Sequence, residues 1–352
     1  MEDQQRKRSK KYATLNDVAK LANTSIATVS YILNDSNKRY VSAELKERVL
    51  QAAKQLNYVK SAVASSLKGK DRGILAVLVP QFDNPFFTRI VVAIEEAVHR
   101  YGYFISISTT VDDIGKERKI IDKMIEQRVD GFIISPTIHG TENTDHLRRL
   151  GIPYVITERN LIGIDQYDFV GCNNWDCGYT ATKHLIDQGH TRIGFIGWNT
   201  LTNVQERECG YVAAMEQHGL QVESDWIQLG ELHSASGYRL MQHFLNSDVS
   251  AIVLGSHILA EGGIMLLRER GVSIPEDMSI VIIGTPNWTQ LNVPKFTCIH
   301  QKEQRIGEIA VDILVKNIIN PNERESWQHE KLSCELLIGN SVKKISHQED
   351  FT

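Results

Sequence analysis

Long apolar stretches are absent from this sequence of 352 residues, in which no apolar run approaches the ~20 residues that a membrane-spanning helix needs. The polar segment MEDQQRKRSKKY at the amino end also lacks the apolar core of a signal peptide. These absences remove the usual signals for membrane insertion and export. They predict a cytoplasmic protein.

Cysteine is scarce, and its spacing is not that of a metal site. The 5 cysteines, Cys172, Cys177, Cys209, Cys298 and Cys334, are scattered, and none shows the CxxC spacing of structural zinc. The 12 histidines form no HxxxH or HExxH pattern. We therefore expect free, mostly buried thiols, and neither a metal nor a cofactor.

Motifs that mark enzymes with parallel sheets are missing as well. The sequence contains no GxSxG nucleophile elbow and no GxxxxGK[ST] phosphate loop. The first expected strand-to-helix turn, residues 79–85, reads VPQFDNP and contains no GxGxxG element. Catalysis is therefore not expected.

Charge is divided unevenly along a chain that is long enough for two or three domains. Residues 1–70 hold 14 Lys and Arg against 6 Asp and Glu, so 14 − 6 gives +8. The totals of 39 and 43 leave 25 against 37 for residues 71–352, which gives −12. A basic segment of this size is typical of a protein that binds a polyanion. We place a basic head, a candidate nucleic-acid-binding domain, over residues 1–60.

Three short helices are predicted in this head. Thr14 and Asp17 fit the start of the first helix. Its apolar stripe is Leu15, Val18, Ala19, Leu21 and Ala22. Asn23 suits a left-handed turn, after which Ser25 caps a second helix and Ser42 a third. The inward residues of the third helix are Leu45, Val49, Ala52, Ala53 and Leu56. The pattern predicts a helix-turn-helix in a compact three-helix bundle.

The residues on the outer side of the second helix indicate whether the bundle is an ordinary one or one that binds DNA bases. Val29, Ile32 and Leu33 face the core. This leaves polar and small residues near the amino end of the helix, namely Ser25, Ile26, Ala27, Thr28, Ser30 and Tyr31. Hydroxyl groups can bond phosphates or base edges, and apolar side chains can pack on thymine methyl groups. We predict that this helix enters the major groove.

Residues 14–34, TLNDVAKLANTSIATVSYILN, resemble the helix-turn-helix signature of the lactose-repressor (LacI/GalR) family of bacterial transcription regulators. Asn57, Tyr58, the segment SAVASSLK at residues 61–68 and the length of the body extend the resemblance over nearly the whole chain. The resemblance implies a repressor that binds a palindromic operator in double-stranded DNA as a homodimer. It adds three expected DNA contacts, Thr14, Asn34 and Tyr58.

Residues 61–72 would, by this resemblance, be a hinge helix and linker that folds in the minor groove. Leu67 would be a wedge that unstacks a central base step. The expected minor-groove contacts are Ala64, Leu67 and Lys68. Small alanines and serines favour a thin helix that fits a narrow groove, although a plain flexible linker is the alternative. Lys60 in place of the usual Pro and Ser65 in place of the usual Arg indicate weaker hinge contacts or a different DNA preference.

The body, residues 73–352, alternates apolar strand-like runs with helix-like stretches, which predicts parallel sheets covered by helices. Two such series predict two doubly wound α/β lobes, and the resemblance implies the periplasmic-binding-protein type of fold. The chain would cross between lobes near residues 171–174, 300–303 and 328–331. Lobe one would span 73–171 plus 303–328, and lobe two 174–300 plus 331–341.

Ligands of such sheets bind beyond the carboxyl ends of the strands, so we expect an effector in the cleft between the lobes. Arg207 is the strongest candidate, since residues 207–211 (RECGY) match an arginine-to-glycine element of the family and guanidinium binds hydroxyls, carboxylate or phosphate. The alternative role of Arg207 is a structural salt bridge. For one of Phe86 and Phe87, the alternative is packing in the core. The candidate effector residues are Asn84, Phe86, Phe87, Ser135, Thr137, Glu158, Arg159, Asn203, Arg207, Leu232, Asn287 and Trp288.

Two departures from the family pattern bear on the effector. Pro286 and His257 stand where relatives usually carry Asp, and this removes carboxylate acceptors for ligand hydroxyls. The expected sugar-like effector is therefore unusual, phosphorylated or absent. One alternative is a regulator that responds to a co-repressor protein or to no ligand. Another is a solute-binding protein.

Overall fold

The structure is a computed structural model that describes residues 12–33, 41–59, 72–198, 202–323 and 326–345, without the side chains of residues 202–204. The chain divides into two compact units between Arg72 and Gly73. We describe the head and the body separately. No helix in the described ranges is both long enough and apolar enough to cross a membrane.

The head contains α1 (Leu15–Leu21), α2 (Ile26–Leu33) and α3 (Ala43–Gln55). Thr14 and Asp17 form a capping box at the start of α1. The Ser25 hydroxyl accepts a hydrogen bond from the Thr28 amide at 3.1 Å, and Ser42 accepts one from the Leu45 amide at 3.3 Å. Each predicted cap therefore satisfies an amide that the helix itself leaves unpaired.

The head core forms where the three helices meet. Its buried residues are Val18, Ala19, Ala22, Val29, Ile32, Val49 and Ala52. Asn23, with φ 49°, makes the predicted left-handed turn between α1 and α2. The inward position expected for Leu21 is wrong, because Ala22 takes the place one turn after Val18 and leaves Leu21 46% exposed.

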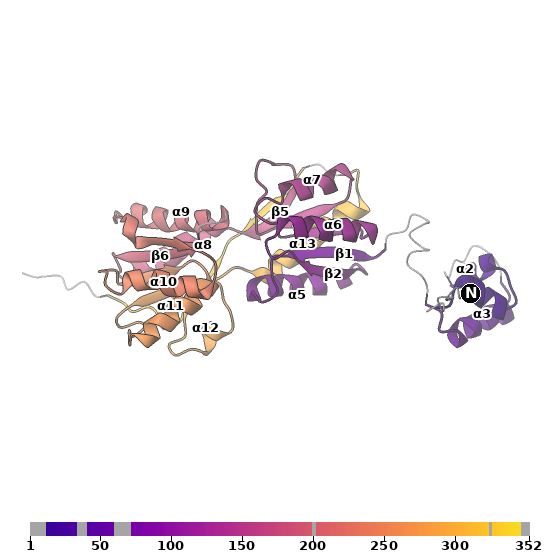
Figure 1. Cartoon of the computed structure of the whole chain (residues 1–352), viewed down its shortest axis with the longest axis horizontal. Coiled ribbons are helices and arrows are strands. Elements are labelled where there is room, and N and C mark those ends of the chain that lie inside the picture. The colour runs from indigo at the N-terminus through magenta and orange to yellow at the C-terminus, as the bar shows by residue number, and fades with distance from the viewer. Residues whose placement is uncertain (1–11, 34–40, 60–71, 199–201, 324–325, 346–352) are drawn as a thin grey trace, which may run out of the picture. The chain divides into compact units, whose positions relative to one another are not determined.

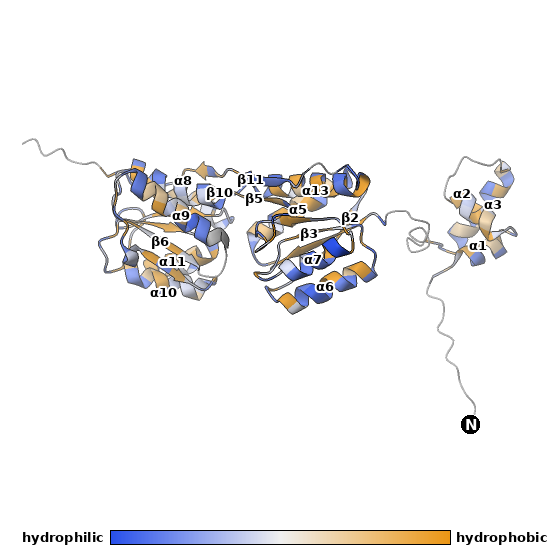
Figure 2. Ribbon diagram, turned by 90° about the horizontal axis from the view of Figure 1, so that it is seen from above, coloured by the Kyte–Doolittle hydropathy of each residue, from blue (hydrophilic) through white to orange (hydrophobic). Residues whose placement is uncertain are grey.

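The first lobe of the body is a six-stranded parallel sheet in the order β11-β5-β4-β3-β1-β2 (Figure 1). Its strands are β1 (Ile74–Val79), β2 (Phe104–Thr109), β3 (Gly131–Ile134), β4 (Tyr154–Thr157), β5 (Asp168–Cys172) and β11 (His329–Leu332). Helices α5 (Pro85–His99) and α13 (Glu303–Ile319) cover one face. Helices α6 (Ile114–Glu126) and α7 (Thr141–Arg149) cover the other (Figure 2).

The second lobe repeats this plan with the strand order β12-β10-β9-β8-β6-β7. Its strands are β6 (Ile193–Trp198), β7 (Ile227–Gly230), β8 (Ala251–Leu254), β9 (Ser279–Ile283), β10 (Thr297–His300) and β12 (Glu335–Leu337). Its helices are α8 (Asn174–Asp187), α9 (Thr202–Gln217), α10 (Ser234–Phe244), α11 (His257–Glu269), the short α12 (Trp288–Leu291) and a 3₁₀ turn, Ser224–Trp226. The strands are mostly apolar, and the outer sides of the helices are mostly polar (Figure 2).

The chain crosses between lobes between β5 and α8, between β10 and α13, and between β11 and β12. The expected third crossing near residues 328–331 is misplaced, because His329–Leu332 pairs with Phe169–Cys172 inside the first sheet. The crossing follows Leu332 instead. One strand also departs from the expected parallel pattern, since β12 reaches the edge of the second sheet antiparallel to β10.

Two glycines let α8 and α9 pack backbone to backbone. A Cβ at Gly178 would overlap the carbonyl oxygen of Arg207, and one at Gly210 would overlap that of Trp175. This close packing fixes the start of α9, which carries Arg207. Only glycine fits at either contact.

We expect Gly178→Ala to lower the free energy of unfolding by about 1–3 kcal/mol, because the added methyl group forces the two helices apart. Gly115→Ala on α6 is the matched control, since its Cβ would meet only the Asp113 side chain at 3.3 Å. The control should leave stability unchanged or raise it by about 0.5–1 kcal/mol. Urea unfolding measures the stability of both variants. Equal unfolding midpoints for the two variants would contradict the close backbone contact at Gly178.

Candidate functional site

The predicted reading face lies at the amino end of α2. Ser25, Ile26 and Ala27 are exposed there, with Ile26 48% exposed. The Ser25 and Thr28 hydroxyls lie 2.8 Å apart and share a hydrogen bond, so part of their bonding capacity is already used within the helix. This end of α2 offers a small apolar surface flanked by hydroxyl groups.

The other predicted DNA contacts are less exposed than Ser25, Ile26 and Ala27, cap a helix, or lie outside the described residues. Thr14 is exposed but caps α1, and Ser30 is half-buried. Tyr31 and Tyr58 are partly buried and pack against the head core. Asn34, Ala64, Leu67 and Lys68 lie outside the described residues.

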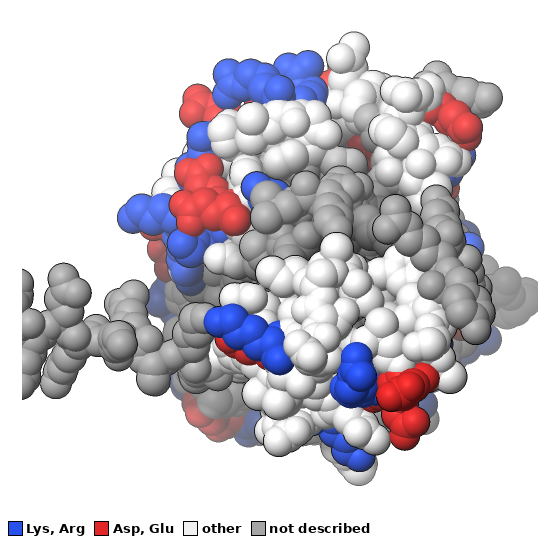
Figure 3. Space-filling model, turned by 90° about the vertical axis from the view of Figure 1, so that its right-hand side faces the viewer, with Lys and Arg blue, Asp and Glu red and all other residues white. Residues whose placement is uncertain are grey.

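The basic character of the head is carried mainly by segments outside the described ranges. Of the 12 Lys and Arg in residues 1–60, the described part holds Lys20, Lys46, Arg48 and Lys54, beside the acidic residues Asp17, Glu44 and Glu47. Both signs are interspersed on the face shown in Figure 3. Arg48 donates to the Ala22 carbonyl at 3.2 Å, which ties α3 to the end of α1.

The body has a cavity of about 40 Å³ where the carboxyl ends of strands from both lobes meet. Its lining includes seven of the residues predicted for the effector site, namely Asn84, Phe86, Phe87, Glu158, Arg159, Arg207 and Leu232. It also includes Trp198, Ser256, His257 and Gln301, which were not among the predicted contacts. Trp198 and Ser256 end or follow strands, so the rule that found Asn84 could have found them.

Four predicted effector residues lie outside this cavity. Ser135 shares a hydrogen bond of 2.7 Å with Thr157, and the Thr137 amide donates to the buried carboxylate of Glu117 at 2.7 Å. The other two, Asn287 and Trp288, bond Arg89 and Glu261. For Asn203 only the helical backbone is described.

Arg207 is 5% exposed and is held by neutral groups. Its Nε donates to Asn174 Oδ1 at 2.8 Å, and its Nη1 donates to the Gly255 carbonyl at 2.6 Å. The guanidinium lies over the Trp198 ring, 5.3 Å from its centroid. Among the described residues Arg207 makes no ion pair within 4.0 Å, so the structural salt bridge considered for it is not formed there.

Glu158 brings a second ionisable group to the cavity. Its carboxyl group is buried, and this burial raises its pKa to about 7 against the opposing effects of a hydrogen bond from the Cys172 amide and the charge of Arg207. The Cys172 amide donates to Oε1 at 3.0 Å. The Glu158 backbone has φ 64°, a conformation that non-glycine residues seldom adopt and that occurs at functional sites.

The pKa shift of Glu158 predicts a pH dependence of stability. An unfolded Glu has a pKa of about 4.3, so the folded carboxyl group holds its proton more tightly. The resulting stabilisation is complete below the unfolded pKa and is lost as the pH rises through about 7. The unfolding free energy of the wild type minus that of Glu158→Gln should therefore fall as the pH rises from about 4 to about 8. Urea unfolding of both proteins tests this, and a pH-independent difference would contradict it.

Three buried polar atoms on the cavity wall have no hydrogen-bond partner within the described part of the chain. They are Trp198 Nε1, His257 Nε2 and Gln301 Nε2. Burial, together with the charges of Arg207 and Arg89, lowers the pKa of His257 to about 4, so its ring is neutral near neutral pH. Buried polar atoms normally find partners, so these three atoms are free to bond a polar molecule that enters the cavity.

Polar contacts outside the cavity wall join the two lobes. Arg89 of α5 donates to the Thr285 hydroxyl at 3.0 Å, to its carbonyl at 2.6 Å and to Asn287 Oδ1 at 3.1 Å. Lys331 pairs with Glu206 at 2.8 Å. Arg159 belongs to the first lobe alone, since it pairs with Asp112 and bonds the Pro136 carbonyl.

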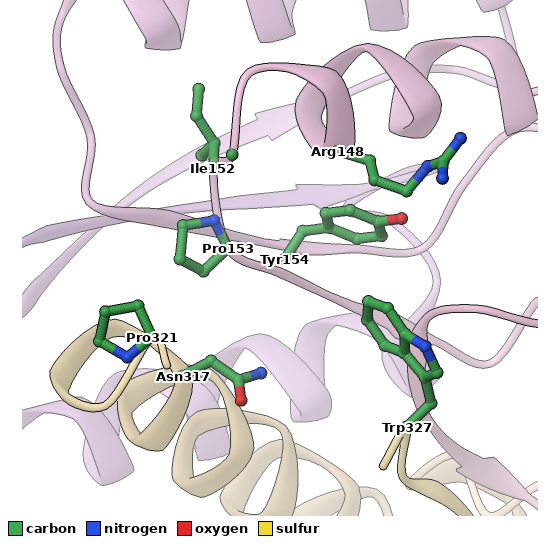
Figure 4. Close-up of a pocket in the computed structure, with 8 residues that line it drawn as sticks. Arg148, Ile152, Pro153, Tyr154, Asn317, Pro321 and Trp327 are labelled. Carbon is green, nitrogen blue, oxygen red and sulfur yellow. The ribbon is translucent and has the colours of Figure 1, made fainter. Parts of the chain in front are cut away.

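A second cavity, of about 150 Å³, lies at the amino end of β4. Figure 4 shows the Tyr154 ring between the side chains of Arg148 and Trp327. The cavity lined by Arg207 lies at the opposite ends of the strands, and no residue predicted for the effector site lines the second cavity. The two cavities are therefore separate.

These features define a class of protein, a transcription regulator with a helix-turn-helix head and a two-lobed ligand-binding body. Residues 14–61 match the family described as bacterial regulatory proteins, lacI family. Residues 72–339 match periplasmic binding proteins and the sugar binding domain of the LacI family. The chain belongs to the LacI family, and it is a DNA-binding transcription regulator.

Relatives and solved structures agree with this assignment. The transcriptional repressor PurR of Pasteurella multocida is 34% identical over 337 residues, which cover 94% of this chain and 99% of the relative. The PurR of Mannheimia succiniciproducens is 32% identical, with 95% and 100% covered. A complex of the regulator CelR with cellobiose has a TM-score of 0.70 at 26% identity, covering 94% of this chain and 99% of its own.

The lac repressor dimer bound to operator and an anti-inducer also shares the fold. Its TM-score is 0.81 at 22% identity, with 95% of this chain and 100% of that chain covered. A LacI family protein from Silicibacter pomeroyi has a TM-score of 0.78 at 25% identity, with 94% and 99% covered. The predicted fold class, a helical head with two α/β lobes, is confirmed.

Proposed function

We propose that this protein is a homodimeric, cytoplasmic repressor without catalytic activity, and that a small polar molecule in the interlobe cavity sets its affinity for a palindromic operator. The observation that carries the proposal is the cavity itself. Both lobes contribute to its wall, which holds the Arg207 guanidinium and three polar atoms without partners in the described ranges.

Operator recognition would begin at α2. Ser25, Ile26 and Ala27 are exposed at its amino end, the part that a recognition helix places against base edges. Two heads related by two-fold symmetry would read two half-sites, since one head contacts too few base pairs for useful specificity. Residues 61–68 would add minor-groove contacts, with Leu67 as the wedge.

The size of the cavity supports coupling between ligand and lobe arrangement. Ligand sites usually enclose about 300–1,000 Å³, whereas this one encloses about 40 Å³. An effector larger than a few water molecules therefore requires the lobes to separate, which strains or breaks the bonds from Arg89 to Thr285 and Asn287. A ligand that prefers the more open arrangement shifts the equilibrium by its difference in affinity, typically about 1–3 kcal/mol.

The wall also constrains the chemistry of the effector. Trp198 Nε1 and Gln301 Nε2 are donors, so they require acceptor atoms on the ligand. Arg207 suits hydroxyl groups, a carboxylate or a phosphate. Phe86, Phe87 and Trp198 offer apolar surface for the face of a ring. A sugar or a sugar derivative meets all three requirements.

Two measurements test the proposal. Genomic fragments selected by the purified protein should share a palindromic sequence that it prefers over competitor DNA. A panel of monosaccharides, sugar phosphates and planar heterocycles should contain a compound that raises the melting temperature and changes affinity for that sequence. Selected fragments without a common sequence would contradict the proposal.

Regulation by a co-repressor protein or by no ligand is the second candidate. His257 and Pro286 stand where relatives of the family usually carry Asp, and the cavity is small. Operator binding that no compound in the panel alters, together with an unchanged melting temperature, would favour this candidate over the first.

A further inference from the structure

Three cysteines lie together where the chain crosses between the lobes. Cys172 ends β5 and Cys177 lies near the start of α8, with their Sγ atoms 3.3 Å apart. Cys334 lies in the crossing between β11 and β12. Its amide donates to Asp176, the residue before Cys177, and its side chain packs against the core that contains Cys172 and Cys177. The first and third crossings therefore meet at this thiol cluster of Cys172, Cys177 and Cys334.

Backbone contacts hold the two crossings side by side. The Asn173 amide donates to the Leu332 carbonyl at 2.8 Å, and the Cys334 amide donates to Asp176 Oδ2 at 3.0 Å. The positions of Cys177 and Cys334 are thus fixed independently of their sulfur atoms. A bond between these sulfurs would join segments that already touch.

The cysteines differ in access to solvent. Cys172 and Cys177 are 1% and 0% exposed, whereas Cys334 is half-buried. A small oxidant dissolved in water can therefore reach Cys334 first. Cys177 lies behind it as a second thiol.

They also differ in acidity. The pKa of Cys334 is lowered, mainly by the neighbouring Cys177 thiol. The pKa of Cys177 is raised well above the usual range by the neighbouring thiols of Cys172 and Cys334 and by burial. Because the thiolate is the nucleophile, Cys334 is the more reactive member of the pair.

We propose that Cys334 and Cys177 form a peroxide-sensitive pair that closes to a disulfide between the first and third interlobe crossings. The Cys334 thiolate attacks one oxygen of hydrogen peroxide, the O–O bond breaks, and the departing hydroxide takes a proton to give water. The Cys177 sulfur then attacks the sulfenic sulfur of Cys334. The S–S bond forms, the S–O bond breaks, and the Cys177 proton leaves with the oxygen as a second water.

The disulfide would form beside the effector cavity. The Cys172 amide donates to Glu158 Oε1, and the carbonyl of Arg207 lies against Gly178, the residue after Cys177. Oxidation would join covalently two of the three crossings, which in the reduced protein are held together by hydrogen bonds. It would therefore restrict the lobe motion through which an effector acts.

The first experiment exposes the reduced, full-length protein to hydrogen peroxide, blocks the remaining thiols and maps the linked peptides by mass spectrometry. We expect a Cys177–Cys334 link that forms about tenfold faster than oxidation of the exposed Cys209, an isolated thiol in the same chain. Oxidation of Cys209 at the same rate, or a Cys172–Cys177 link in place of the expected one, would overturn the proposal.

Two variants separate the roles of the thiols. In Cys177→Ala, the sulfenic acid on Cys334 should persist and react with dimedone. In Cys172→Ala, the matched control, the Cys177–Cys334 link should still form. Loss of the link in the control would overturn the assignment, and if a variant fails to fold the wild-type peptide map decides alone.

The regulatory consequence rests on the proposed function. Operator affinity of the protein, measured before and after oxidation, should differ by about fivefold or more and return on reduction with dithiothreitol. A complete link without a change in affinity would overturn the regulatory role. Absence of operator binding in both states would instead overturn the proposed function, while the peptide map still decides the oxidation site.

Discussion

Replacement of Leu67 by alanine is expected to weaken binding to the operator by about 100-fold, with little change in binding to unrelated duplex. Leu67 is the proposed wedge, and removal of its side chain lets the central base step restack. A symmetric dimer loses two wedges, so a loss of about 1.4 kcal/mol at each gives a hundredfold change. Fluorescence anisotropy with operator and scrambled duplexes at one salt concentration measures both affinities.

The matched control for this experiment is Val59→Ala, which removes an apolar side chain that is 70% exposed. It should leave both affinities within about twofold, since surface substitutions usually change stability by less than about 0.5 kcal/mol. If Leu67→Ala reduced operator and scrambled affinity equally, the wedge would be discarded and residues 61–68 would be a plain linker.

The second large effect is expected from Arg207→Ala. The guanidinium holds the cavity wall through Asn174 and Gly255 and is the proposed anchor of the effector. The variant should lose the response, so that the ratio of operator affinities with and without an active compound falls to one. Anisotropy titrations with the compound found in the panel measure this ratio.

Arg207→Lys and Arg192→Ala sharpen the test. Lysine keeps the positive charge but loses the planar fork of donors, so only part of the response should remain. Arg192 lies on the surface of the same lobe, where it pairs with Asp248, and its removal should leave the response intact. Urea unfolding confirms that each variant is folded. An unchanged response in folded Arg207→Ala would remove Arg207 from the effector site.

The local features of the head could be predicted from the sequence because each depends on neighbouring residues. Thr14, Ser25 and Ser42 cap their helices as expected, and Asn23 makes the left-handed turn. Leu21 could not be placed by periodicity, since it and Ala22 both fit the inward position and only packing decides between them.

In the body, the rule that ligands meet strand ends located much of the cavity wall but not the direction of each side chain. Ser135 and Thr137 follow β3, as expected, yet they bond Thr157 and the buried Glu117. Those partners lie far away in sequence, so no local pattern reveals them. The short polar strand β11, with the sequence HEKL, has no apolar signal, and the third crossing was misplaced for this reason.

We propose that paired helical heads select one duplex sequence and that the hinged body adjusts the selection. The most direct measurement is the affinity of the purified protein for its selected genomic fragment in excess competitor DNA, with and without each compound of the panel. We predict strong preference for the fragment and a change of about fivefold or more with at least one compound. Equal affinity for the fragment and the competitor under every condition would contradict this mechanism.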